Sequence, residues 1–476
     1  MGNRKKETAN RVDEARSAAV DLVYAVMEND SYTNLSVDQA FSGKPLSSLD
    51  RSFATALSYG TITRIVVLDA ILSKYSAKPL DRLDPLVRTL LRVGAWQIFW
   101  SDRIPDSAAC NESVKLAKRM TNPGAASYVN ALLRTLIREK SSILQDFILA
   151  PRDFGLRCCL PSELAGSFRK WFGENRTLAL CEAMNEPSPA TARVNTQRAS
   201  VVNVRNSLNS SGCTTSDPVF MEDAFSLRTN GSMMEALPAF VQGEFVIQDE
   251  AAMLVSVVAD PKPGQRVIDL CAAPGGKACH MAGRMQDQGE IIACDINPAR
   301  LELVRQNAAR LGLSILRTLT MDACTITPGI GISDPDGAPS LSQADIVLAD
   351  VPCSGLGILG KKPDIRIHMT YDKMVSLYPV QEQILENAAS LVKPGGFLVY
   401  STCTLNPKEN QDRIRQFLDV HPSLFEPVDF SSLLPDRLVE LDPSLAGAAA
   451  AGMLTLFPDL HHCDGFFIAK LRRKDA

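Results

Sequence analysis

The sequence predicts a chain of several domains, with an all-α domain first, a small α/β region next and a doubly wound α/β domain last. The chain has 476 residues, which is more than one hydrophobic core normally supports. Its first third places apolar residues at every third or fourth position, the period of a helix, whereas its last part alternates short apolar runs with helix-like stretches. We expect the three domains to span residues 1–145, 146–260 and 261–476.

The composition is that of an ordinary globular protein, with 45% hydrophobic and 22% charged residues and a net charge of −4. Residues 1–150 carry 20 Lys and Arg against 16 Asp and Glu, a balance of +4, and the remainder carries 30 against 38, a balance of −8. The basic first third is compatible with a nucleic-acid partner, although a solvated surface of mixed charge is the simpler interpretation. The same two interpretations apply to Lys115, Lys118 and Arg119, which would share one helical face.

The cysteine and histidine pattern predicts no metal site. None of the twelve cysteines forms a C-x-x-C pair, and His461-His462-Cys463 lacks a fourth ligand at suitable spacing. Cysteines in apolar runs are typical of core residues in a reducing compartment. The start of the chain shows no apolar signal segment, and no apolar run reaches the roughly 18 residues of a membrane span. We therefore expect a cytoplasmic protein without a membrane partner, and we expect it to be a monomer.

Local patterns define the boundaries of these domains. The helical period extends from Val12 to Lys140, and Leu90–Trp100 is so apolar that most of it must be buried. Pro187-Ser188-Pro189 predicts a linker, after which alternating polar and apolar residues predict a small mixed α/β element. Two later segments predict surface loops: Thr327–Gln343, and the alanine-rich Leu445–Gly452.

Four short apolar runs predict buried parallel strands in the last domain. They span residues 265–270, 290–295, 345–350 and 396–401. Ligands of an open parallel sheet bind beyond the carboxyl ends of its strands. A glycine-containing turn directly follows the first run, and we expect its backbone to approach a cofactor. This turn consists of Cys271, Ala272, Ala273, Pro274, Gly275, Gly276 and Lys277.

Three aspartates follow later strands in an order that suits a nucleoside cofactor carrying a methyl group. Asp295 would face a ribose diol, Asp322 an adenine amino group and Asp350 a sulfonium. Each aspartate alone could equally cap a strand end or a turn, so it is their order that favours a cofactor site. Lys277 and Arg300 are candidate cofactor residues at the mouth of the cleft, with solvated helix residues as the alternative.

Two cysteines stand where such a site would need a nucleophile. Cys353 follows the run that ends at Asp350, and Cys403 follows the run that ends at Ser401. Cytosine C5 is a weak nucleophile, and a thiolate that adds to C6 makes it enamine-like. Enzymes that methylate amino groups carry Asn/Asp-Pro-Pro-aromatic at this strand end. Asp350-Val351-Pro352-Cys353 stands there instead, which favours carbon as the target.

These motifs resemble a known family. From Gln248-Asp249 onward the chain resembles the Sun/Fmu family of RNA 5-methylcytosine methyltransferases, through "DLCAAPGGK", "DVPCSGLG", "KKPDIR" and "YSTCTLNPKENQ". Its first part is similar to the RNA-binding antitermination factor NusB, through "DRSFATALSYGTITR" and "YVNALLRTLIR". The resemblance implies a NusB-like helical RNA-binding domain and a C-terminal class I Rossmann-like methyltransferase domain.

The resemblance also implies an activity. The chain would transfer a methyl group from S-adenosylmethionine to C5 of a cytosine in 16S ribosomal RNA, with the base flipped out of its stack. Cys403 would attack C6, and Cys353 would assist release. The turn at 271–277 and the three aspartates named above would bind the cofactor. In the small middle region, Arg193 and Asn195 could contact RNA.

Departures from the family pattern are small, and two other functions stay open. Val351 stands where alanine is usual, and Ala278-Cys279 replaces a pair that usually contains threonine; neither change removes a functional group. The NusB-like third leaves open a non-catalytic RNA-binding or assembly factor that retains cofactor binding. A methyltransferase for proteins or small molecules is the other alternative. Turnover with ribosomal RNA, and competition by RNA, would separate the three.

Overall fold

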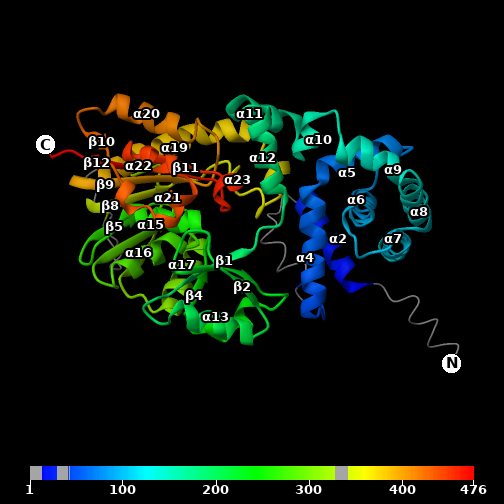
Figure 1. Cartoon of the computed structure of the whole chain (residues 1–476), viewed down its shortest axis with the longest axis horizontal. Helices are drawn as coiled ribbons and strands as arrows, with labels where there is room; N and C mark the ends of the chain where they lie inside the picture. Colours follow the sequence, from blue (N-terminus) through cyan, green and yellow to red (C-terminus); the bar gives the residue numbers. More distant parts are fainter. Residues whose placement is uncertain (1–12, 29–40, 42, 327–340, 476) are drawn as a thin grey trace. The chain divides into compact units, whose positions relative to one another are not determined.

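The chain forms two compact units. The computed structural model describes residues 13–28, 41, 43–326 and 341–475. The first unit comprises residues 1–187 together with 359–370, and the second comprises residues 188–358 together with 371–476. Most of the first unit is coloured blue to blue-green in Figure 1.

Amphipathic helices build the first unit, as the apolar period predicts. Asp84 and Asn122 cap two of them, each followed by a proline at the first helical position, an arrangement that satisfies the free N–H groups at a helix start. Leu57, Leu68 and Leu91 are fully buried in the shared core. The helices are α2 (Glu14–Glu28), α4 (Ser48–Thr63), α5 (Ile65–Tyr75), α6 (Pro85–Trp100), α7 (Asp106–Met120), α8 (Pro123–Arg138), α9 (Lys140–Ile143), α10 (Phe154–Cys158), α11 (Ser162–Phe172) and α12 (Glu174–Asn185).

A buried arginine holds a distant segment in the first unit. Arg366 lies in helix α18 (Ile365–His368) and is 1% exposed. Its Nη1 donates to the Leu359 carbonyl at 2.7 Å, and its Nη2 donates to the Met184 carbonyl and to Asn185 Oδ1, both at 2.8 Å. Burial lowers the pKa of Arg366 to about 10. The arginine of "KKPDIR" therefore has a structural part in this unit, since it holds its segment at the end of α12.

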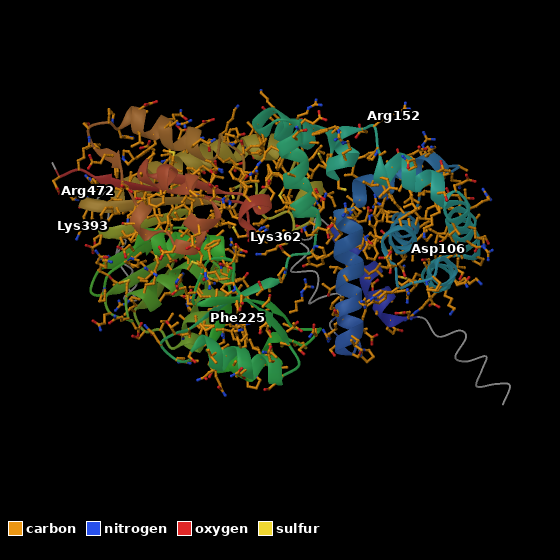
Figure 2. All side chains as sticks on the ribbon, viewed as in Figure 1. Asp106, Arg152, Phe225, Lys362, Lys393 and Arg472 are labelled. Carbon is orange, nitrogen blue, oxygen red and sulfur yellow. The ribbon has the colours of Figure 1, made fainter. Side chains whose placement is uncertain are left out.

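The second unit begins with a small antiparallel sheet, as the sequence predicts for the middle region. The strand order is β2-β3-β1-β4, and helix α13 packs its Val204 and Leu208 into the same core. Phe225, labelled in Figure 2, is fully buried there. The elements are β1 (Ala190–Val194), α13 (Val201–Ser210), β2 (Thr214–Ser216), β3 (Ala224–Arg228), α14 (Pro238–Val241) and β4 (Phe245–Ile247).

The prediction that Arg193 and Asn195 of this small sheet contact RNA is wrong, because both side chains are buried. Arg193 is 5% exposed, and its Nε donates to Gln248 Oε1 at 2.8 Å. Asn195 is 7% exposed, and its amide donates to the Gly243 carbonyl at 3.0 Å and the Leu311 carbonyl at 3.1 Å. Both side chains fasten the small sheet to its surroundings in the second unit. Their hydrogen-bond partners come from distant parts of the chain, which a local pattern does not reveal.

A mixed eight-stranded sheet forms the centre of the second unit, with the order β10-β12-β9-β8-β5-β6-β7 and β11 paired with β12. Strands β5 to β9 are parallel, as predicted, whereas β10, β11 and β12 pair antiparallel. The strands are β5 (Arg266–Asp269), β6 (Glu290–Asp295), β7 (Leu316–Thr320), β8 (Ala344–Asp350), β9 (Val392–Thr402), β10 (Phe425–Pro427), β11 (Met453–Leu456) and β12 (Phe466–Arg473).

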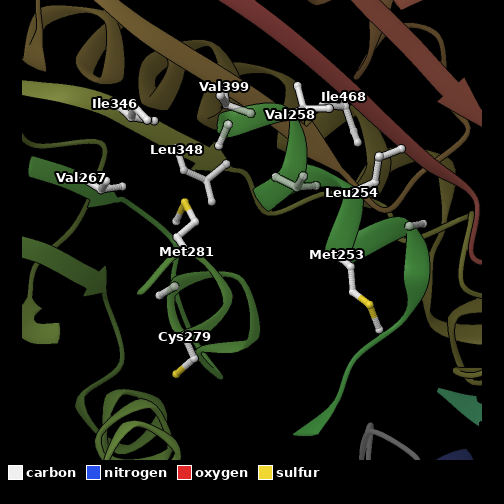
Figure 3. Close-up of a cluster of buried hydrophobic side chains, with 14 of the residues drawn as sticks. Met253, Leu254, Val258, Val267, Cys279, Met281, Ile346, Leu348, Val399 and Ile468 are labelled. Carbon is white, nitrogen blue, oxygen red and sulfur yellow. The ribbon is translucent and has the colours of Figure 1, made fainter. Parts of the chain in front are cut away.

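Helices pack on this sheet in two hydrophobic cores. One core takes side chains from α15 (Glu250–Ala259), α16 (Gly276–Arg284) and α17 (Pro298–Leu311). Figure 3 shows Leu254 of α15 and Met281 of α16 in this cluster with Leu348 of β8. The other core takes side chains from α19 (Tyr371–Leu391) and α20 (Gln411–Val420). Because the chain runs from β5 outward to β7 and then returns to β8 beside β5, the strand order reverses between β5 and β8. Ligands bind at such a point.

One predicted loop is a helix instead. The alanine-rich segment Leu445–Gly452 forms most of α22 (Ser444–Ala450), with Leu445 and Ala449 buried. Alanine has the highest helix propensity, and here two apolar side chains also reach the core. The other predicted loop, Thr327–Gln343, lies almost entirely outside the described residues. The remaining short helices are α21 (Asp436–Leu441) and α23 (Pro458–His461).

No single helix in the described ranges is long and apolar enough to cross a membrane. Helices α4 and α5 meet the length and composition criteria only as a pair, and the pair bends by 72°.

The buried position of Asn195 predicts a stability effect. Asn195→Ala leaves two buried carbonyls without their donor, which costs about 1–3 kcal/mol and lowers the melting temperature by roughly 2–4 °C for each kcal/mol. Gln197→Ala is the matched control, because it removes one exposed hydrogen bond to the Gly283 carbonyl. Thermal melting of both variants checks the difference. Unchanged stability of Asn195→Ala together with weakened RNA binding would restore the RNA-contact role.

Candidate active site

The glycine turn lies at the carboxyl end of β5, where the strand order reverses. The Ala272 N–H donates to the Cys294 carbonyl at the end of β6, and the Gly275 N–H donates to the Ala272 carbonyl, both at 2.8 Å. Gly275 has φ +103°, and a Cβ there would lie 3.1 Å from Val304. The position thus requires glycine for its backbone conformation and its close approach to α17. The turn opens α16 at Gly276.

Asp295 and Arg300 lie together beside this turn. Asp295 is 4% exposed, and its Oδ1 accepts from the Asn297 N–H at 2.9 Å. The Arg300 guanidinium lies 3.5 Å from Asp295 Oδ2 and donates to the Ala273 carbonyl at 2.8 Å. Asp322 is close in the sheet, because the preceding Met321 N–H donates to the Asp295 carbonyl. Asp322 Oδ1 accepts from the Cys324 N–H at 2.9 Å, so this side chain also stabilises its own turn.

Asp350 and Lys277 form a partly buried ion pair at the reversal point. Lys277 Nζ donates to Asp350 Oδ2 at 2.7 Å, and Ser401 Oγ donates to Asp350 Oδ1 at 2.7 Å. Burial lowers the pKa of Lys277, but the charge of Asp350 and its hydrogen bond outweigh this effect, so the pKa is raised. Lys277 is therefore positively charged, and it is close enough to Cys403 for the two groups to interact.

Asp269 is a further residue of the candidate site, one that the sequence motifs did not single out. It ends β5 and is 1% exposed, and its Oδ2 has no hydrogen-bond partner among the described residues. Burial, followed by the charge of Asp350, raises its pKa to about 7. A buried carboxylate is costly unless a cation or a hydrogen-bond donor satisfies it. Its signal in the sequence was an acid at the end of an apolar run, directly before the turn.

The two predicted cysteines meet. Cys353 Sγ and Cys403 Sγ are 3.4 Å apart, and both cysteines are partly buried. Strands β8 and β9 bring them together, since Asp350 pairs with Ser401 and the Gly357 N–H donates to the Cys403 carbonyl at 3.0 Å. The hydrogen bond with Cys403, followed by burial, raises the pKa of the Cys353 thiol well above its ordinary value. In the resting site Cys353 therefore holds its proton.

Several other polar residues singled out from the sequence have partners within the protein. Lys115 pairs with Glu112 at 2.8 Å, and Arg119 pairs with Glu14 at 3.0 Å. His461 Nδ1 accepts from the Phe457 N–H at 2.7 Å. Across the described ranges, no group of three or more His, Cys, Asp or Glu side chains could hold a metal ion.

Comparison with known proteins places the chain in a family. Residues 256–472 match the 16S rRNA methyltransferase RsmB/F family, residues 13–138 match the NusB family, and residues 160–234 match the RsmF/B-like ferredoxin-like domain. A probable ribosomal RNA small subunit methyltransferase B from Synechocystis is 34% identical over 96% of this chain and 99% of its own length. The chain belongs to the ribosomal RNA small subunit methyltransferase B family. The corresponding Bacillus subtilis protein is 32% identical over 96% of the chain and 98% of its own length.

Solved structures agree with this assignment. The crystal structure of PH0851 has a TM-score of 0.78 and is 26% identical, covering 97% of this chain and 99% of its own. A methyltransferase homolog from Pyrococcus horikoshii has a TM-score of 0.53 and is 30% identical, covering 68% of this chain and 99% of its own. The NusB-like helical domain, the small α/β region and the C-terminal methyltransferase domain are thereby confirmed. As a methyltransferase of this family the chain uses S-adenosylmethionine, the expected cofactor.

The residues around the turn fit that cofactor. S-adenosylmethionine carries a positive sulfonium and ammonium as well as a ribose diol. Asp269, Asp295 and Asp350 supply carboxylates, and Asp269 has an oxygen still without a partner. Gly275 and Gly276 allow close approach of the backbone. Ile296, which follows Asp295, exposes 65% of its surface and offers an apolar contact for a flat ring.

The raised pKa of Asp269 predicts pH-dependent cofactor binding. In the free protein this carboxyl is largely protonated below pH about 7, and a positively charged cofactor favours its ionised form. Affinity should therefore fall as the pH drops from 8 to 6, by up to about tenfold per pH unit. Asp269→Asn should flatten this dependence and weaken binding at pH 8. Isothermal titration at both pH values checks it, with Asp419→Asn, an exposed acid on α20, as the control. Equal slopes in the Asp269 variant and the wild type would contradict it.

Proposed function

We propose that this protein transfers a methyl group from S-adenosylmethionine to C5 of a cytosine in 16S ribosomal RNA, through a covalent adduct between Cys403 and C6 that Cys353 helps to resolve. The observation that carries the proposal is the cysteine pair: two sulfurs 3.4 Å apart at the ends of adjacent parallel strands, beside the Lys277–Asp350 pair. A cytosine ring in reach of one sulfur is then also in reach of the other.

Attack begins at Cys403. Its thiolate adds to C6 of the flipped cytosine, and the electron pair of the C5=C6 bond makes C5 nucleophilic. The Lys277 ammonium, whose charge interacts with Cys403, stabilises negative charge on the sulfur before attack. When bound, S-adenosylmethionine supplies the sulfonium methyl group that the activated C5 accepts. Asp350, held by Lys277 and Ser401, orients the groups at this strand end.

Release belongs to Cys353. In the resting site its hydrogen bond with Cys403 is the main cause of its raised pKa. Once the Cys403 sulfur is bonded to C6 it is a thioether that can carry no negative charge, so this cause is removed and Cys353 can lose its proton to water more readily. The Cys353 thiolate then takes the C5 proton. The electrons of that C–H bond restore the C5=C6 bond, and Cys403 leaves as a thiolate.

The helical unit supports an RNA substrate. Its match to the NusB family and the +4 balance of residues 1–150 both favour a nucleic-acid partner. The same match supports the alternative, an RNA-binding or assembly factor that holds cofactor without turning it over. The paired sulfurs argue against this alternative, because binding alone does not need them. Methyl transfer from labelled cofactor to ribosomal RNA decides between the two.

Cys403→Ala should abolish methyl transfer to ribosomal RNA, because the variant lacks the nucleophile. We expect a loss of at least about 10³-fold, measured with radiolabelled cofactor. Cys110→Ala, a cysteine of α7 in the other unit, should keep wild-type activity. Activity in Cys403→Ala near the wild-type level would rule out the adduct.

Cys353→Ala should form the adduct but release it slowly, so that a covalent protein–RNA complex accumulates. Denaturing gel electrophoresis should show a shifted band that requires both RNA and cofactor. The double variant Cys353→Ala/Cys403→Ala should show none. A Cys353 variant that turns over at the wild-type rate without a shifted band would remove the release role.

A further inference from the structure

A buried carboxylate joins the two loops that carry the cysteines. Glu409, between Cys403 and helix α20, is fully buried. Its Oε2 accepts from the Ser354 N–H at 2.9 Å and from Gln381 Nε2 at 2.8 Å. Its Oε1 accepts from the Ser354 hydroxyl and from Asn406 Nδ2, the latter at 2.8 Å. Each oxygen thus accepts two hydrogen bonds, and all four donors are uncharged.

These donors belong to both sides of the cysteine pair. Ser354 directly follows Cys353, and Asn406 lies in the loop that follows Cys403. The Ser354 hydroxyl also shares a hydrogen bond with Thr404 at 2.7 Å. Gln381 of α19 donates to the Pro352 carbonyl at 3.0 Å as well. The Cys353 loop is therefore held from both ends by a network whose shared acceptor is Glu409.

A carboxylate is a costly choice for a buried position. Burying one without a cation is unfavourable unless hydrogen bonds satisfy it, and an apolar core residue would stabilise the fold at least as well. The network instead fixes geometry, because four donors must converge on two oxygens. We propose that Glu409 is a positioning residue that holds the Cys353 loop against the Cys403 loop, so that attack and release occur in one register. The inference rests on the proposed function for what that register achieves.

The test is Glu409→Gln, which keeps the shape of the side chain. With its NH₂ in the place of Oε2, the new amide faces the Ser354 N–H and Gln381 Nε2, and Gln381 can turn to accept only by giving up the Pro352 carbonyl. With its NH₂ in the place of Oε1, it faces Asn406 Nδ2, and the Ser354 hydroxyl has to turn from donor to acceptor. Glu382→Gln is the matched control, since Glu382 is an exposed acid of α19 that pairs with Arg413. Thermal melting and cofactor affinity report whether each variant is folded and binds.

Two measurements report whether the Cys353 loop keeps its position relative to the Cys403 loop. Dibromobimane becomes fluorescent when it bridges two neighbouring thiols, and the part of the signal lost in Cys353→Ala reports the Cys353–Cys403 pair without RNA or cofactor. In Glu409→Gln we expect this bridging rate and kcat each to fall at least about tenfold, since small misplacements of reacting groups are costly. Cofactor affinity should stay within about twofold of wild type, because Glu409 does not touch the turn. Glu382→Gln should leave all of these unchanged.

A folded Glu409→Gln protein with wild-type bridging and wild-type kcat would overturn the inference. If that variant does not fold, Ser354→Ala replaces it, because it removes only the hydroxyl's hydrogen bonds to Glu409 and Thr404. We then expect the same two rates to fall by about threefold, and unchanged rates would overturn the inference. Failure of the proposed function looks different: wild-type protein would not methylate cytosine C5, whereas its bridging rate would still depend on Glu409.

Discussion

The parallel pairing of β8 with β9 is the constraint on which the site depends. It sets Asp350 opposite Ser401. Beyond these positions each strand leads into a loop that carries one cysteine. A shift of one residue in this register would turn alternate side chains to the other face of the sheet. Asp350 would lose Ser401, and the sulfurs would no longer meet. The apolar cores on both faces hold the register, because Leu348 and Val399 pack on one face while Val347 and Leu398 pack on the other.

The charges of the candidate cofactor site do not balance. Asp269, Asp295 and Asp350 end neighbouring strands, and Lys277 and Arg300 compensate only part of their charge. Such a site is unfavourable when empty and favourable for a cation. We propose that a cofactor with a sulfonium and an ammonium supplies the compensating positive charge. The raised pKa of Asp269 shows that its ionised form is unfavourable in the free protein. In the proposed mechanism Lys277 also stabilises the thiolate of Cys403, so the cofactor site and the reaction share one charged group.

Most of the candidate site was predictable because its residues follow strand ends, and strand ends follow from short apolar runs. The turn at 271–277 and both cysteines were found in this way. Other features depend on contacts between distant parts of the chain. Arg193 and Asn195 are residue types that often contact RNA, but both are buried and make hydrogen bonds to distant parts of the chain, such as the bond from Asn195 to the Leu311 carbonyl. Glu409 was hidden for the same reason, since nothing local shows that Ser354 and Gln381 converge on it. The antiparallel pairing of β12 with β9 likewise depends on a contact between segments that are distant in the sequence.

The proposed mechanism requires a covalent bond between the sulfur of Cys403 and C6 of the pyrimidine ring. The most direct test uses a ribosomal RNA transcript in which 5-fluorocytosine replaces cytosine, because fluorine at C5 cannot leave as a proton does and the adduct persists. The wild-type protein is incubated with this RNA and S-adenosylmethionine, digested with nuclease and protease, and analysed by mass spectrometry. We expect a methylated fluorocytosine nucleotide on the peptide that contains Cys403. A nucleotide on Cys353, or no adduct from protein that methylates ordinary RNA, would contradict it.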